Sequence, residues 1–148
     1  MTRVLLDANV FLHAVGSDAV LRPACRRVLS MVEAGELVGE ASALIVDEIV
    51  HVRNRRLGDR QQAVADGTAA AALCLLHPVA QEDVEAAMGL FVEAPRLQMR
   101  DAIHAAVARR YGLSVVLSRD RGFDGIPGLR RVDPADVEAI AALVAGSG

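Results

Sequence analysis

The sequence predicts an α/β fold in which a short parallel sheet lies between two layers of helices. Short apolar runs alternate with longer amphipathic segments along the chain, as in parallel sheets whose connecting helices cover both faces. The length of 148 residues suits one domain with a single core. We therefore expect residues 1–148 to form one three-layer α/β/α unit.

The first half of the chain is expected to start with a strand and continue into helices. Its predicted elements are a strand over 2–6, a helical turn over 10–14, a helix over 19–34, a strand over 37–39, a helix from Ser42 to about 56 and a helix over 60–74. Ser17 or Asp18 is the expected cap of the second of these helical segments, and Ser42 caps the next helix. Gly67 is expected to weaken the last one, because glycine disfavours helix interiors.

The second half repeats the alternation of helices and strands. Its predicted elements are an extended segment over 75–79, helices over 81–91 and 99–111, strands over 113–117 and 129–132, and a helix over 134–144. Pro78 suits an edge strand, because it cannot donate a ladder hydrogen bond. Pro134 is expected at the first position of the last helix, behind a capping Asp133.

Composition excludes several classes of protein. The chain is 53% hydrophobic with a mean hydropathy of +0.31, yet no apolar run approaches the roughly 18 residues of a membrane helix. Because its start also lacks a signal-peptide pattern, we expect a cytoplasmic protein. Cys25 and Cys74 have no metal-like spacing and are expected to be free thiols.

All sixteen basic residues are arginine, and there is no lysine. This argues against receiver domains, aspartate-nucleophile phosphohydrolases and P-loop NTPases, which use a lysine in the site. The net charge of −3 does not exclude a nucleic acid partner, since four carboxylates gathered around a metal would leave the remaining surface at +1. Arg53, Arg55 and Arg56, followed by Arg60, form the densest basic stretch, which suits either phosphate contact or a solvated helix end.

Two acids lie just after predicted strands. Asp7 comes after the strand over 2–6, and Asp120 comes after the strand over 113–117. Ligands of open α/β sheets bind in the crevice at the carboxyl ends of the strands. Taken singly, each aspartate is more readily explained as a cap or turn residue; as a pair, they indicate a site.

Two further acids are selected by helical periodicity. Glu48 borders the apolar face of its helix, whereas the adjacent Asp47 points away from it. A boundary salt bridge with Arg27 or Arg53 would also explain Glu48. Asp101 lies in the first turn of the apolar helix over 99–111, where the helix dipole alone could favour it.

The four acids would repel one another unless a cation neutralised them. An all-oxygen site selects a hard cation such as Mg²⁺ or Mn²⁺, and these ions typically act on phosphates. His104 lies one turn beyond Asp101. It is expected to be a core or boundary histidine rather than a substrate contact.

The chain resembles the PIN-domain family, and specifically the toxin ribonucleases of VapBC-type toxin–antitoxin pairs. The resemblance spans nearly the whole chain in the family's order. It is carried by Leu5–Val10, Ala41-Ser42 with Glu48, Arg100–Ala106, Leu117–Asp124 and Ile126–Leu129.

The resemblance implies a metal-binding and catalytic quartet formed by Asp7, Glu48, Asp101 and Asp120. It gives supporting positions to Asn9 and Ser118. Whether Asp124 contributes is open, because Gly122 stands where many relatives carry another acid. The implied reaction is endoribonuclease hydrolysis of RNA by metal-activated water with Mg²⁺ or Mn²⁺, leaving 5′-phosphate and 3′-hydroxyl ends.

The resemblance also implies partners: a homodimer, and an antitoxin whose C-terminal segment lies over the active-site groove. Two other functions fit the same residues. One is a non-catalytic PIN module that acts as a binding scaffold, and the other is a DNA-directed or rRNA-processing nuclease of the same fold.

Overall fold

A parallel sheet of five strands forms the centre of the molecule, with strand order β3-β2-β1-β4-β5. The structure is a computed structural model and describes residues 1–146. The strands are β1 (Arg3–Leu6), β2 (Val38–Ser42), β3 (Leu75–His77), β4 (Val115–Leu117) and β5 (Arg130–Val132). From β1 the chain adds strands first on one side and then on the other, so a topological switch point lies between β1 and β4.

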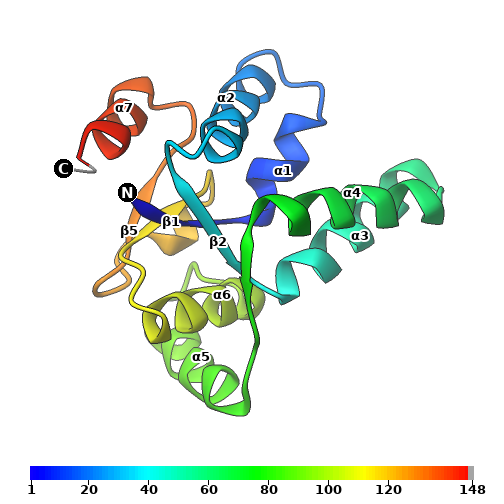
Figure 1. Ribbon diagram of the computed structural model, residues 1–148. Helices are drawn as coiled ribbons and strands as arrows, with labels where there is room; N and C mark the ends of the chain where they lie inside the picture. The colour runs from blue at the N-terminus through cyan, green and yellow to red at the C-terminus, as the bar shows by residue number, and fades with distance from the viewer. Residues whose placement is uncertain (147–148) are drawn as a thin grey trace.

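Helices cover both faces of this sheet (Figure 1). They are α1 (Ala8–Ala14), α2 (Leu21–Glu33), α3 (Leu44–Leu57), α4 (Arg60–Leu73), α5 (Gln81–Glu93), α6 (Met99–Arg110) and α7 (Val137–Ala145), with a 3₁₀ turn η1 (Arg121–Phe123). Figure 1 shows α5 and α6 on one side of the sheet and α1, α2 and α7 on the other. The expected three-layer α/β/α fold is confirmed.

The core is divided by the sheet into two clusters. Val4 and Leu6 of β1 pack with α1, α2 and α3, whereas Leu5 packs with α6 and Phe123. This follows from the alternation of side chains along a strand. Because both faces of β1 are fully covered, its carboxyl end is held rigidly where Asp7 begins.

Gly67 is a packing residue and does not interrupt α4, which runs unbroken through it. A Cβ atom at this position would lie 2.6 Å from Val50 Cγ2 of α3. The missing side chain lets α3 and α4 approach closely, and the weakening of α4 by glycine stays a prediction. Gly89 of α5, in contrast, has no atom within 4 Å of an added Cβ.

Two predicted helix caps are wrong and one is confirmed. Ser42 is the last residue of β2, which extends beyond the predicted 37–39, and α3 begins without a side-chain cap. The last helix is capped by Asp136, whose side chain accepts from the Ala139 amide, and not by Asp133. Asp18 Oδ1 accepts from the Val20 and Leu21 amides at 2.8 Å, so its side chain caps the start of α2 as predicted, although Val20 is the residue at the N-cap position.

A buried carboxylate in the middle of β2 links β1, β2 and β3 through hydrogen bonds. Glu40 of β2 is fully buried and accepts hydrogen bonds from Arg3 Nε at 2.6 Å and from Arg3 Nη2 at 2.9 Å. His77 Nε2 lies 2.6 Å from Glu40 Oε1, the oxygen that also accepts from Arg3 Nη2, and the His77 ring stacks on Tyr111. Burial alone would raise the pKa of Glu40, but the Arg3 and His77 hydrogen bonds outweigh it and lower that pKa.

The edge strand, the cysteines and the lengths of the helices also bear on the sequence predictions. β3 is an edge strand, as predicted, but it ends at His77, so Pro78 follows the strand and does not lie within it. Cys25 and Cys74 are free thiols, and burial raises their pKa values to about 11 and about 12. None of the helices in the described part of the chain combines the length and apolar character needed to span a membrane.

Candidate active site

Asp7 is fixed at the carboxyl end of β1 by two hydrogen bonds. It caps α1 through Oδ1, which accepts from the Ala8 amide at 2.8 Å. Its Oδ2 accepts from Ser118 Oγ at 2.6 Å. With only 4% of its surface exposed, Asp7 presents a fixed carboxylate to the switch point and has little freedom to turn away.

Ser118 joins the two strand ends across the switch point. Its hydroxyl, which donates to Asp7, accepts from Asn9 Nδ2 at 3.0 Å and from the Asp120 amide at 2.9 Å. Asn9 Oδ1 in turn accepts from the Arg119 amide. The structure therefore brings Asn9 and Ser118 to the two strand-end acids as bridging groups.

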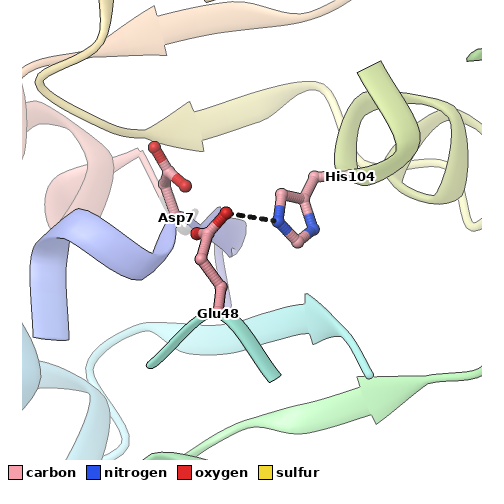
Figure 2. A group of neighbouring side chains, drawn as sticks. All are labelled: Asp7, Glu48 and His104. Carbon is pink, nitrogen blue, oxygen red and sulfur yellow. Dashed lines mark ion pairs between the residues drawn. The ribbon is translucent and has the colours of Figure 1, made fainter. Parts of the chain in front are cut away.

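Glu48 and His104 approach Asp7 from the helices on either side of the strand ends, as Figure 2 shows. One ligand atom from each of the three residues lies within 4.8 Å of the other two, so this group could hold a metal ion. Glu48 Oε1 is 3.9 Å from His104 Nε2 and 3.5 Å from Arg100 Nη1. Asp47 is exposed, as its helical position predicted.

Asp101 and Asp120 complete the acidic cluster. Asp101 is buried in the first turn of α6, and the neighbouring Asp120 carboxyl helps to raise its pKa. Asp120 Oδ1 also accepts from the Gly122 amide at 2.8 Å and so caps the η1 turn. Asp7 and Glu48 both act electrostatically on Asp101. All four sequence-selected acids therefore converge at the carboxyl edge of the sheet.

Crowding of these carboxylates favours bound protons when no cation is present. Burial raises the pKa of Asp101 to about 8, and Asp7, Glu48 and Asp120 act in the same direction. Burial also raises the pKa of Asp7 to about 6, although Ser118 and His104 favour its charged form. A divalent cation bound here would replace a proton at neutral pH, which suits a metal site.

His104 is the residue that sequence reasoning placed outside the site. It is buried, as expected, but its ring reaches the acid cluster and belongs to the group with Asp7 and Glu48. The available signal was its position three residues after Asp101, which puts both side chains on one face of α6. Arg100, exposed beside Glu48, was also missed.

Asp124 makes no direct hydrogen bond to the four acids in the part of the chain that the structure describes. Its Oδ1 accepts from Arg131 Nε at 2.8 Å, and its side chain is 52% exposed. The Arg131 hydrogen bond lowers the pKa of Asp124. Arg131 also donates to the Ser118 carbonyl at 3.1 Å, so Arg131 connects Asp124 to the backbone of the site.

Gly122 has no room for a side chain. A Cβ atom would lie 2.8 Å from the Arg96 carbonyl oxygen and 3.1 Å from Asp120 Oδ1. The backbone of the loop before α6 therefore packs directly on this glycine. The packing around position 122 therefore favours glycine.

The basic stretch on α3 divides into paired and exposed members. Arg53 donates from Nε to Asp66 Oδ2 at 2.7 Å and is largely buried by this contact. Arg55 and Arg56, in the last turn of α3, are exposed. Only the latter two are available for a phosphate without breaking an ion pair.

The parallel α/β fold, with acids gathered at its switch point, is the architecture expected of a PIN domain. Comparison with known proteins supports this assignment. Residues 4–129 match the PIN domain, and the chain belongs to that family. Its relatives include ribonuclease VapC7 of Mycobacterium tuberculosis, which is 30% identical over 133 residues, or 88% of this chain and 91% of the relative. The resemblance seen in the sequence is thereby confirmed.

Solved structures share the fold at lower identity. A crystal structure of Mycobacterium tuberculosis VapC20, described as a sarcin–ricin-loop-cleaving toxin, has a TM-score of 0.69 at 19% identity, covering 86% of this chain and 98% of that one. A toxin–antitoxin complex from Klebsiella pneumoniae has a TM-score of 0.62 at 22% identity, covering 88% and 97%.

Proposed function

We propose that this protein is a metal-dependent endoribonuclease and the toxin of a toxin–antitoxin pair, with residues 1–148 acting as one nuclease domain. The observation that carries the proposal is the convergence of four acids at the switch point of a PIN domain. The names of the relatives support it, since VapC7 is a ribonuclease and VapC20 is described as a sarcin–ricin-loop-cleaving toxin.

In this proposal Asp7, Glu48, Asp101 and Asp120 hold Mg²⁺ or Mn²⁺. The bound ion would supply a water of lowered pKa and positive charge beside the scissile phosphate. Asn9 and Ser118 keep Asp7 turned toward the ion through the hydrogen bonds described above. Asp124 contributes at a distance by holding Arg131 against the Ser118 carbonyl.

Positively charged groups around the pocket would receive the RNA backbone. Arg100 is exposed beside Glu48 at the mouth of the site. Arg55 and Arg56 extend the basic surface along α3, whereas Arg53 has first to leave Asp66. These contacts are to phosphates, so they would supply affinity rather than sequence preference.

A matched pair of variants tests the proposal. Purified protein is incubated with RNA in Mg²⁺, in Mn²⁺ and in EDTA, and the ends of the products are sequenced. Glu48→Gln is expected to reduce cleavage by at least about 100-fold, because it removes a ligand charge. Asp47→Asn, its exposed neighbour, should cleave like the wild type.

Two results would contradict the nuclease proposal. Cleavage that persists in EDTA, or products ending in a 2′,3′-cyclic phosphate, would exclude water activated by a metal. If the folded wild type cleaves no RNA but binds it, the protein is a scaffold.

The proposed partners are a second copy of the chain and an antitoxin. The Klebsiella pneumoniae relative in fold was solved as a toxin–antitoxin complex. This chain has an apolar groove between α1, α2 and α4, lined in part by Phe11, Leu12, Leu29 and Leu73, which suits an apolar antitoxin segment. Exposed Met88, Phe91 and Val92 on α5 suit a protein contact. Light scattering of the purified protein without an antitoxin tests whether it forms a dimer. We also propose that the protein is cytoplasmic.

A further inference from the structure

His104 contains an unusual nitrogen atom. The residue is 2% exposed, and its Nε2 is the single buried side-chain nitrogen or oxygen without a hydrogen-bond partner among residues 1–146. Buried polar groups are nearly always paired, because an unpaired one costs about 1–3 kcal/mol. An atom left in this state inside an acidic pocket therefore indicates a missing partner.

The other ring nitrogen determines what that partner can be. His104 Nδ1 lies 2.7 Å from Ser42 Oγ, at the end of β2. If Nδ1 carries the proton and donates to the serine oxygen, Nε2 has a free lone pair directed at the acids. Histidines that bind metals typically have this arrangement, with one nitrogen donating to a supporting group and the other on the metal.

The distances also favour an ion over a direct contact. Nε2 is 3.9 Å from Glu48 Oε1, beyond the roughly 3.2 Å limit of a good N–H···O hydrogen bond. The three ligand atoms of Asp7, Glu48 and His104 lie within 4.8 Å of one another. Ligands about 2.1 Å from an octahedral ion are about 3.0 Å apart when adjacent and about 4.2 Å apart when opposite. A small inward movement of the side chains would complete the site.

We propose that His104 Nε2 is a nitrogen ligand of the cation held by Asp7 and Glu48, so that this end of the site favours a transition-metal ion such as Mn²⁺ over Mg²⁺. This inference rests on the proposed metal site and deepens it. Mg²⁺ prefers oxygen ligands and keeps several waters, whereas imidazole suits first-row transition metals. The site is then a mixed nitrogen and oxygen site and not the all-oxygen site expected from the acids alone.

Pulsed EPR of the Mn²⁺-loaded protein tests the proposal directly, because it detects a nitrogen bound to the metal without measuring activity. The wild type is expected to show a ¹⁴N modulation that changes frequency when histidine alone is labelled with ¹⁵N. His104→Gln should lose the modulation. His51→Gln, an exposed histidine on α3, is the matched control and should retain it.

Binding measurements give a second readout. His104→Gln is expected to weaken Mn²⁺ binding by at least about tenfold and Mg²⁺ binding by less than about threefold, which lowers the selectivity between the two ions. Ser42→Ala, which removes the support of Nδ1, should weaken Mn²⁺ binding by about tenfold. The labelling experiment on the wild type is decisive even if His104→Gln does not fold.

The possible failures can be told apart. Mn²⁺ that binds without any histidine nitrogen signal, or a signal that survives in folded His104→Gln, overturns the role of His104 and leaves the carboxylate site intact. If the wild type binds no Mn²⁺ and no Mg²⁺, the proposed nuclease site itself falls and His104 with it.

Discussion

Ser118 shows how much of the site depends on one hydroxyl. It contacts Asp7, Asn9 and the Asp120 amide at once. Ser118→Ala removes all three contacts and leaves a buried Asp7 oxygen without its donor. We expect about tenfold weaker metal binding and a similar loss of RNA cleavage, as for supporting groups of metal ligands. Titration calorimetry checks this, with Ser114→Ala at an exposed position as the unaffected control.

Asp101 determines how stability depends on pH in the metal-free protein. Its pKa is raised to about 8 by burial and by Asp7, Glu48 and Asp120, while the unfolded chain titrates near the ordinary value of about 3.9. Between these values the folded state holds one more proton than the unfolded state. The free energy of unfolding therefore falls as pH rises from 4 to 8, by up to about 1.4 kcal/mol per pH unit from this residue.

Asp101→Asn should remove this dependence. At pH 4 the variant and the wild type are expected to be similarly stable, and at pH 8 in EDTA the variant should be the more stable one. Urea unfolding at several pH values measures the difference. A wild type whose stability rises between pH 5 and 8 in EDTA would contradict the assignment, because it would mean that Asp101 is charged throughout.

At the scale of elements, the hairpin of α3 and α4 depends on Gly67. Gly67→Ala would place a carbon 2.6 Å from Val50 Cγ2, and we expect a loss of about 1–3 kcal/mol from overpacking. Gly89→Ala on α5 meets no atom within 4 Å and should gain about 0.5–1 kcal/mol from higher helix propensity. Thermal unfolding of the two variants should move in opposite directions; a shared direction would refute the packing role.

Glu40 is expected to be the strongest polar contribution of β2. Glu40→Gln removes the negative charge that contacts Arg3 and His77. Removing one partner of a buried ion pair typically lowers the free energy of unfolding by about 3–5 kcal/mol. Arg3 is 46% exposed and can be solvated, so we expect the lower end of that range. Glu82→Gln, which loses only an exposed contact 3.8 Å from Arg110, should cost under about 0.5 kcal/mol in the same denaturant experiment.

For the whole molecule, metal binding should appear as stability. An ion that binds only the folded state adds about 2.7 kcal/mol at 100 times its dissociation constant. For a chain of this length, that corresponds to a melting temperature higher by about 5–10 °C. Scanning calorimetry with Mn²⁺ should show the increase, EDTA should reverse it, and Asp7→Asn should abolish it. An unchanged melting temperature at saturating ion would count against a folded-state site.

The fold and the acids could be predicted because they depend on local pattern. Apolar runs mark strands, and Asp7 and Asp120 follow two of them, so their meeting needed only the rule that strand ends share an edge. Glu48 was separated from Asp47 by the 100° step of a helix. Both inferences depend on the local spacing of residues within one strand or one helix, which the sequence shows directly.

What could not be predicted depends on distant contacts. Ser42 has the sequence context of a helix cap, but pairing of β2 with β3 extends the strand to it and leaves its hydroxyl for His104. The packing role of Gly67 is visible only when α3 is placed against it. Whether Nε2 of His104 has a hydrogen-bond partner depends on all the residues that surround the ring in the folded protein. The spacing of residues in the sequence cannot predict this.

The position of β1 also governs when the protein can become active during its synthesis. This strand is made first, yet one of its neighbours is β4, and Asp7 accepts a hydrogen bond from Ser118, 111 positions later in the chain. A ribosome adding about 5–20 residues per second therefore exposes Asp7 for several seconds before its serine exists. A message truncated before Ser118 would yield a chain with an unpaired central strand and an unsupported first acid. The proposed catalytic pocket is thus among the last parts of the molecule to be assembled, although its first residue is among the earliest to be made.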